Sequence, residues 1–191
     1  MATARICPVR RYRLVRPWRG HGAAMRVAPV GAYFADDPDA VVEQAGKSAK
    51  VTHAHPEGVA GAVAVALAAA LACRLHGGVA TADPRDFLDL TFSHMPESAV
   101  REGIRQARDL PSDPAISTAV VALGNGGPVS AQDTLPFTRW CAAQYLDNYE
   151  EALWATSTLG DRDTKCAILG GIVACFTGEQ GIPEPWRLAC M

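Results

Sequence analysis

Three Asp-Pro pairs constrain the fold of this chain most, because each one is a helix start written in the same way. They stand at Asp37-Pro38, Asp83-Pro84 and Asp113-Pro114. An aspartate accepts hydrogen bonds from the free N–H groups of a helix, and proline fits the first helical position, where its missing N–H is not needed. The segments that follow carry apolar residues at helical rather than alternating spacing. The pattern predicts an all-α protein.

The remaining boundaries agree with this prediction. Residues 123–128, Leu-Gly-Asn-Gly-Gly-Pro, are typical of a helix end followed by a loop. Ser130, with Asp133 three residues later, predicts a new helix, and Tyr149 to Thr158 predicts another that Gly160 closes. The best strand candidate, Ile116 to Leu123, is β-branched but has the flanks of a helix.

Two segments carry small residues at the spacing that lets helix backbones approach closely. The first contains Gly58, Gly61 and Ala62, and the second contains Ala167, Gly170, Gly171 and Ala174. We expect two central, tightly packed helices whose N-terminal segments, residues 52–57 and 160–164, lie in one neighbourhood. The uncharged run from 58 to 73 is shorter than the ~20 residues of a membrane span, so it predicts a buried helix and no membrane partner.

Composition indicates one domain, since 191 residues with 49% hydrophobic and 20% charged side chains can bury a sizeable core. Residues 1–19 hold six arginines and no acid, which predicts a disordered basic segment. The rest of the chain has 12 basic and 20 acidic residues, so we expect no general attraction for nucleic acid. Six cysteines without a CxxC pair or a secretory signal favour a cytoplasmic protein with reduced thiols.

A cluster of oxygen donors stands at residues 159–164, Leu-Gly-Asp-Arg-Asp-Thr, where a helix is expected to begin. The side chains of Asp161, Asp163 and Thr164 can turn several oxygens toward one hard cation such as Mg²⁺ or Mn²⁺. The same residue types are also favoured as helix caps. The pattern argues against an EF-hand, because the sixth loop position lacks glycine and the twelfth lacks glutamate.

Two further segments suggest a nucleotide-like ligand. Helix N-termini attract phosphate oxygens, and the small-residue loop from Gly20 to Arg26 lets a backbone approach a ligand closely. His53 and His55 are two residues apart, which is not helical metal-ligand spacing. For each of them a hydrogen-bonded structural histidine is the simpler interpretation.

At this point the sequence resembles the ADP-ribosylglycohydrolases, a family that includes the dinitrogenase-reductase-activating glycohydrolase and the eukaryotic ADP-ribosyl hydrolases. Five segments carry the resemblance and follow in the family's order: Gly22–Pro29, Val51–Gly58 with Gly61-Ala62, Ser130–Phe137, Gly160–Thr164 and Gly178–Pro183. The resemblance implies an all-α orthogonal helix bundle over residues 20–191. It also implies a cleft that holds ADP-ribose and two Mg²⁺ or Mn²⁺ ions.

The resemblance further assigns roles to individual residues. Asp161, Asp163 and Thr164 correspond to metal ligands. The loop residues and one histidine correspond to contacts with ADP-ribose: Gly22, Ala23, Ala24, Met25 and His53. The implied reaction is hydrolysis of the glycosidic bond of an ADP-ribosylated protein side chain or of a small ADP-ribosyl compound, with metal ions activating water.

The chain also departs from the family pattern. Gly20-His21-Gly22 stands where the family usually has Gly-Asn-Gly, so one polar contact changes. The family's Thr-Asp-Asp-Thr metal motif lies before this loop, and residues 1–19 contain no such motif. We therefore expect an N-terminally truncated member that lacks half of the family's metal shell, so that Asp161, Asp163 and Thr164 alone would hold an ion weakly and a second metal site is doubtful. The alternative is a non-catalytic remnant that binds ADP-ribose weakly or acts as a helical interaction module, and exposed apolar faces predict self-association.

Overall fold

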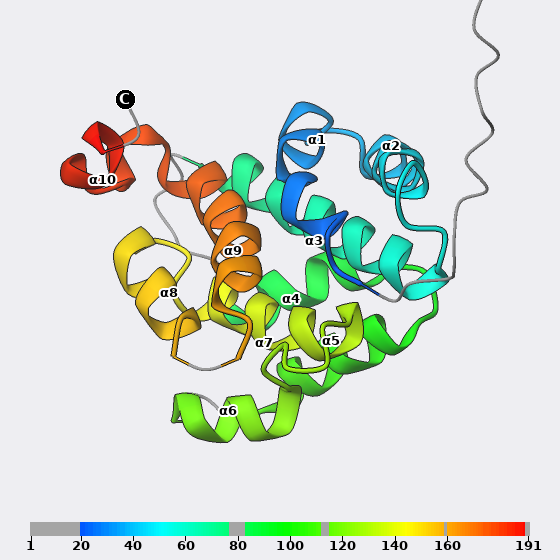
Figure 1. Ribbon diagram of the computed structural model, residues 1–191. Coiled ribbons are helices and arrows are strands. Elements are labelled where there is room, and N and C mark those ends of the chain that lie inside the picture. Colours follow the sequence, from blue (N-terminus) through cyan, green and yellow to red (C-terminus); the bar gives the residue numbers. More distant parts are fainter. Residues whose placement is uncertain (1–19, 77–82, 112–114, 159, 190–191) are drawn as a thin grey trace, which may run out of the picture.

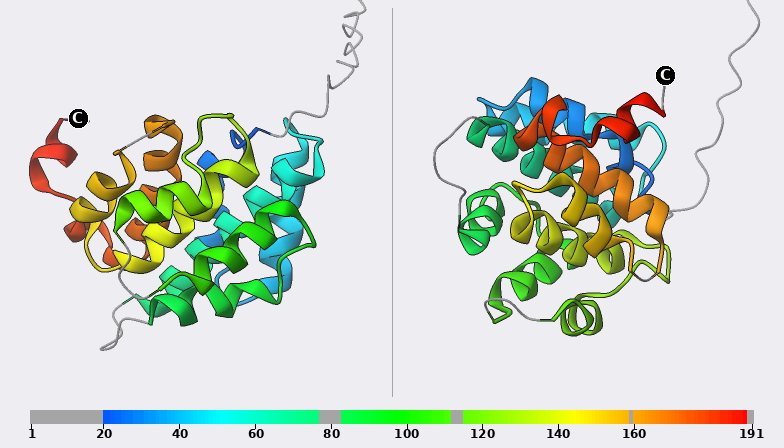
Figure 2. Two further views of the ribbon diagram at one scale, coloured as in Figure 1. Left: turned by 90° about the horizontal axis from the view of Figure 1, so that it is seen from below. Right: turned by 90° about the vertical axis from the view of Figure 1, so that its left-hand side faces the viewer.

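The computed structural model describes residues 20–76, 83–111, 115–158 and 160–189. In this part of the chain the regular elements are α-helices and two short 3₁₀ turns, which confirms the all-α prediction. The elements are η1 (Ala24–Arg26), α1 (Ala28–Tyr33), α2 (Pro38–Lys50), α3 (Pro56–Leu75), α4 (Pro84–Phe92), α5 (Ala99–Asp109), α6 (Ile116–Leu123), α7 (Ala131–Gln144), α8 (Tyr149–Thr156), α9 (Arg162–Thr177), η2 (Glu179–Gly181) and α10 (Glu184–Leu188). The helices run in several directions rather than along one axis (Figures 1 and 2).

Two of the three Asp-Pro helix starts are confirmed atom by atom. Asp37 accepts a hydrogen bond from the N–H of Ala40 at 3.0 Å before α2, and Asp83 accepts one from the N–H of Arg85 at 2.8 Å before α4. The third pair, residues 113–114, and the Arg-rich residues 1–19 lie outside the described residues. The strand candidate is a helix, α6, whose end at Gly124 has the positive φ of +91° that glycine adopts easily.

Helix α3 lies at the centre of the bundle, where it packs against α1, α2, α7 and α9 (Figure 1). By length and composition it is the one helix in the described ranges that could cross a membrane, but 72% of its most apolar window is buried inside the protein. The uncharged run therefore forms a buried core helix, as the sequence predicts. Its alanines pack without losing side-chain rotamer freedom.

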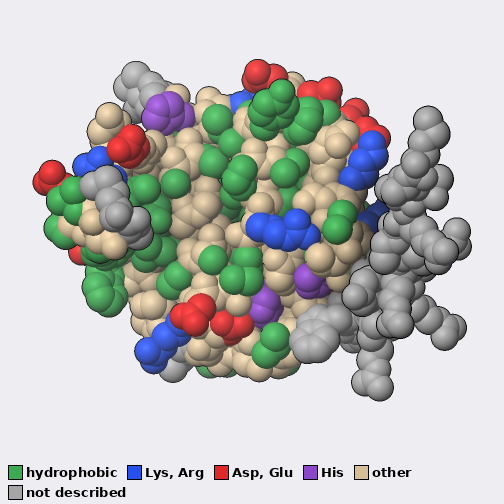
Figure 3. Space-filling view, turned by 45° about the horizontal axis from the view of Figure 1, so that its top comes forward, with side chains coloured by type: hydrophobic (Ala, Val, Ile, Leu, Met, Phe, Trp, Pro, Cys, Tyr) green, Lys and Arg blue, Asp and Glu red, His purple; other side chains and the backbone are tan. Residues whose placement is uncertain are grey.

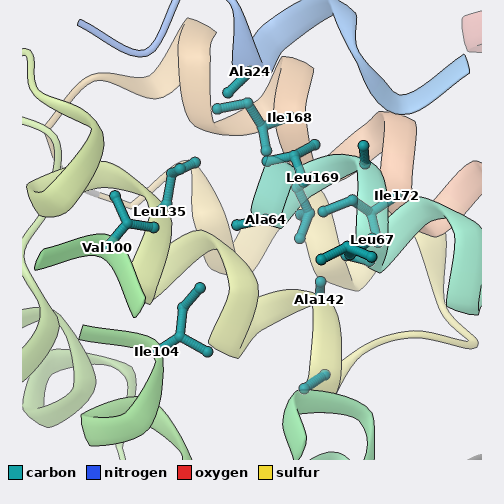
Figure 4. Packing of buried hydrophobic residues seen from close by; sticks show 14 of the residues in the cluster. Ala24, Ala64, Leu67, Val100, Ile104, Leu135, Ala142, Ile168, Leu169 and Ile172 are labelled. Atoms are coloured by element: carbon teal, nitrogen blue, oxygen red, sulfur yellow. The ribbon is translucent and has the colours of Figure 1, made fainter. Parts of the chain in front are cut away.

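The small residues of α3 and α9 serve different contacts from those expected. The two helices do pack together, but a Cβ at Gly61 would meet Leu135 of α7. On α9, Gly170 faces the Tyr149 hydroxyl of α8, and Gly171 faces the Cβ of Ala28. The glycines thus allow α1, α7 and α8 to pack closely against the central pair, α3 and α9. Larger residues join the central pair itself, with Leu169 and Ile172 of α9 close to Leu67 of α3 in Figure 4.

One large polar side chain is enclosed in this core. Arg139 of α7 is fully buried, and its Nη1 donates to the carbonyl oxygen of Ala64 at 2.5 Å. Its Nη2 donates to Thr91 Oγ1 at 2.7 Å, whereas its Nε makes no hydrogen bond within the described residues. The guanidinium also lies 5.6 Å from the centre of the Phe87 ring. Burial lowers the pKa of Arg139 to about 10, because the charged form loses its hydration.

Candidate functional site

The N-terminus of α9 carries the predicted metal ligands on a turn that a second loop holds in place. Asp161 caps the helix, since its Oδ1 accepts from the N–H of Thr164 at 3.3 Å. Its own N–H donates to the carbonyl oxygen of Asn125 at 3.3 Å. Gly160 has φ +71°, and a Cβ there would overlap the same carbonyl oxygen. Only glycine fits this close approach of the two backbones.

The supporting loop is built around a carboxylate that sequence analysis treated as a helix-start residue. Asp133 Oδ2 accepts from the N–H of Gly126 at 2.7 Å, which ties the loop to α7. Gly126 has φ +84°, and a Cβ there would lie 3.1 Å from the Cβ of Asp161. The loop therefore packs directly against the turn that carries Asp161.

His21 joins this turn to the glycine loop, and sequence analysis did not assign it a role. Its side chain is buried, with a relative exposure of 4% for the residue. Its Nε2 lies 3.1 Å from Asp161 Oδ2, and its Nδ1 lies 3.0 Å from Thr134 Oγ1 of α7. The one signal in the sequence was the departure from Gly-Asn-Gly. The imidazole thus connects three segments that are far apart along the chain.

His53 lies on the other side of the glycine loop. A Cβ at Gly22 would be 3.1 Å from His53 Cε1 and 3.2 Å from its Nε2, so the ring faces the loop backbone closely. The two expected neighbouring segments, residues 52–57 and 160–164, therefore meet through Gly20-His21-Gly22. His55, by contrast, is structural, because its Nδ1 accepts from the N–H of Glu57 at 3.1 Å and caps α3.

A hydrogen-bond chain links His53 to Arg26. Arg26 Nη2 donates to Thr52 Oγ1 at 2.8 Å, and that hydroxyl lies 2.8 Å from His53 Nδ1. Burial, with the charges of Arg26 and His21, lowers the pKa of His53. This environment favours the neutral ring, which has one N–H donor and one acceptor nitrogen. With Nδ1 held against Thr52, Nε2 is the ring nitrogen that faces Gly22.

The other loop residues differ in what they can offer to a ligand. The side chains of Ala23 and Ala24 are almost wholly buried in the core, and Figure 4 shows Ala24 against Ile168. Only their backbone groups can reach a ligand. Met25, in contrast, is 38% exposed. On the face drawn in Figure 3, histidine and acidic side chains come to the surface close to one another.

The donor set of the α9 turn fits a hard divalent cation in its chemistry. Asp161 is partly exposed, Asp163 is exposed, and Thr164 is nearly buried. Carboxylate and hydroxyl oxygens are the ligands that Mg²⁺ and Mn²⁺ prefer. Within the described ranges, however, no group of three or more His, Cys, Asp or Glu side chains converges on one point. The described residues offer few ligands for such an ion, so water would have to supply the rest of its shell.

Comparison with known proteins identifies relatives over most of the chain. A 34% identical protein of Archaeoglobus fulgidus, called an uncharacterized protein, aligns with 86% of this chain and 51% of its own length. ADP-ribosylhydrolase ARH3 of Gallus gallus is 30% identical over 90% of this chain, and that of Mus musculus is 25% identical over 90%. The chain spans about half the length of these relatives.

The similarity to one protein family extends over almost the whole chain. The sequence model of the ADP-ribosylglycohydrolase family matches residues 4–191, which include the glycine loop, His53 and the α9 turn. The helical architecture and the order of the motifs agree with that match. The chain belongs to the ADP-ribosylglycohydrolase family.

Proposed function

We propose that this protein is a metal-dependent hydrolase that releases ADP-ribose from a modified side chain or from a related ADP-ribosyl compound. One observation carries the proposal: the glycine loop brings His53 and the oxygen donors of the α9 turn together. The segments that precede α3 and α9 both contact this loop, His53 at Gly22 and Asp161 at His21, and the positive N-terminal ends of helices favour the negative charge of a diphosphate.

Different residues of the site would hold the metal ion and bind the ADP-ribose. Asp161, Asp163 and Thr164 would hold Mg²⁺ or Mn²⁺, and when bound the ion would polarise a ribose oxygen or lower the pKa of water. His53 Nε2 would hydrogen-bond to the ligand. The backbone of Gly22, Ala23 and Ala24 approaches the ligand closely, and Met25 offers it an apolar contact.

The alternative function is a module that binds ADP-ribose without hydrolysing it. The sparse donor set favours this alternative, since the described residues offer no cluster of three acidic, histidine or cysteine ligands. An ion held by two carboxylates and a hydroxyl binds more weakly than one in a fuller shell. A second metal ion and self-association stay predictions, and so does a cytoplasmic location.

The test is the release of ADP-ribose from an ADP-ribosylated peptide, followed by chromatography with Mg²⁺, with Mn²⁺ and with EDTA. Wild-type protein is expected to release ADP-ribose only with a divalent ion, and the double variant Asp161→Asn/Asp163→Asn is expected to lose that release. Asp36→Asn, which changes an exposed acid between α1 and α2, is the matched control and keeps it. Full activity in the double variant contradicts the assignment of these ligands.

A thermal melt separates the two candidate functions. A ligand that binds the native state raises its stability by RT ln(1 + [L]/Kd), which is about 2.7 kcal/mol at a concentration of 100 Kd. A melting temperature that rises with Mg²⁺ and ADP-ribose together, without any release of ADP-ribose from the peptide, identifies the binding module. No response to either ligand contradicts both functions.

A further inference from the structure

We propose that the cavity between α3, α4 and the start of α2 binds a small molecule with an apolar body and one carboxylate, such as a medium-chain monocarboxylic acid. This inference concerns a second site and does not rest on the hydrolase function proposed above. The α3 residues that line the cavity run from Leu67 to Leu75. At a rise of about 1.5 Å per residue they lie roughly 16 to 28 Å along α3 from its N-terminus at Pro56, so the cavity is well separated from the candidate site.

The cavity is small and mostly apolar. Its volume is about 270 Å³, which is at the lower end of the range for ligand sites and suits a small molecule. Leucines form much of its wall: Leu67, Leu71 and Leu75 of α3 and Leu90 of α4. Leu67 is nearly buried, whereas Leu90 is 59% exposed. An apolar body in the cavity would cover part of Leu90 and so remove apolar surface from water.

The two ionisable side chains of the lining are both basic. Arg74, in the last turn of α3, is exposed, and its guanidinium forms no ion pair with any side chain in the described ranges. His94 follows α4, and its Nδ1 lies 3.9 Å from Asp39 Oδ1. The acids at the start of α2 leave Arg74 uncompensated, because the Asp39 side chain is 98% exposed and Asp37 Oδ1 accepts from the N–H of Ala40.

A third positive charge lies behind the cavity wall. Thr91 lines the cavity, and its Oγ1 accepts from Arg139 Nη2 at 2.7 Å. Arg139 is fully buried, and its hydrogen-bond partners among the described residues are this hydroxyl and the Ala64 carbonyl oxygen. Water screens a buried charge poorly, so Arg139 adds to the positive potential inside the cavity. The lining and the residue behind it therefore favour an anion.

The arrangement fits a carboxylate better than the other head groups. A guanidinium can donate two parallel N–H bonds to the two oxygens of a carboxylate, and the lining holds one guanidinium. A phosphate carries up to two negative charges at neutral pH, which one guanidinium does not balance. An uncharged apolar ligand would fill the cavity but would make no use of Arg74.

Calorimetric titration of the full chain tests the choice of ligand with octanoate, octanol and octyl phosphate. Octanoate is expected to bind with a Kd of about 1 mM or lower, the usual affinity for about ten non-hydrogen atoms, and about tenfold more tightly than octanol. Equal affinities for octanoate and octanol would show that the cavity is apolar only. Tighter binding of octyl phosphate, or no binding of octanoate, would also overturn the inference.

Variants test where octanoate binds. Arg74→Gln is expected to weaken octanoate about tenfold, as for the loss of a hydrogen bond to a charged group, and to leave octanol unchanged. Arg85→Gln is the matched control, because Arg85 is an exposed arginine of α4 outside this lining. The double variant Asp161→Asn/Asp163→Asn should bind octanoate like wild-type protein. Unchanged octanoate binding in Arg74→Gln, or its loss in the double variant, would overturn the inference without affecting the hydrolase proposal.

Discussion

Replacing the buried Arg139 by methionine is expected to change the stability of the protein little, although it removes two hydrogen bonds. The charge has no acidic partner among the described contacts, and its Nε is unsatisfied. Burial lowers the pKa of Arg139 to about 10, and at about 1.4 kcal/mol for each tenfold change in proton affinity the charged form costs the folded state roughly 3 kcal/mol.

The substitution leaves neither hydrogen-bond partner orphaned. Thr91 Oγ1 still donates to the carbonyl oxygen of Leu88 at 3.2 Å, and Ala64 keeps its place inside α3. Two hydrogen bonds from a charged donor contribute about 1.5 kcal/mol each, at the lower end of their range. The desolvation of the guanidinium and its two hydrogen bonds therefore nearly cancel, and the net expectation for Arg139→Met is a change of less than about 1 kcal/mol in the free energy of unfolding.

Urea denaturation followed by circular dichroism measures this change, with the slope of the transition checked against wild-type protein. Arg105→Met is the control, because Arg105 pairs with Glu102 on the surface, where solvent screens the interaction. A loss of more than about 1.5 kcal/mol in Arg139→Met would refute the reasoning. It would mean that the two hydrogen bonds outweigh the desolvation of the guanidinium.

Two further predictions concern the candidate site. Because the pKa of His53 is lowered in the folded state, the unfolded chain binds a proton more readily, and the free energy of unfolding should fall as the pH drops through 6.5. Urea denaturation at pH 7.5 and at pH 5 measures this loss. The loss between the two pH values should be smaller in His53→Gln than in wild-type protein. Gly160→Ala should lower the free energy of unfolding by about 2 kcal/mol or more, because its Cβ would overlap the Asn125 carbonyl at φ +71°. Urea denaturation measures this loss, with Ala167→Gly as the control. A loss in Gly160→Ala that is smaller than the loss in the control would contradict the prediction.

Much of the fold was predictable because helix boundaries depend on nearby residues. Asp37 and Asp83 cap helices through atoms two or three residues away, so the sequence around them contained the whole interaction. Residues 116–123 were ambiguous, since β-branched residues favour strands, but the glycine at 124 marked a helix end. The long uncharged helix was predictable from its composition.

The rest depended on contacts between distant segments. The spacing of Gly61 indicated close packing but could not say that Leu135 of α7 would be the neighbour. Arg139 gave no signal of burial, because arginine is usually exposed. In the site, Asp161 was predictable as a cap and as a ligand candidate, whereas the role of His21 depends on Thr134, which is 113 residues away.

That separation has a consequence for how the site comes into being. His21 contacts Thr134 across 113 residues of sequence, and it also contacts Asp161, so the three side chains meet only when a long loop has closed, which costs conformational entropy. No local fragment can assemble the three side chains. A signal that requires all three side chains would therefore count fully folded molecules and ignore partly helical ones. Such a signal would measure the fraction of natively folded protein in a refolding or expression experiment.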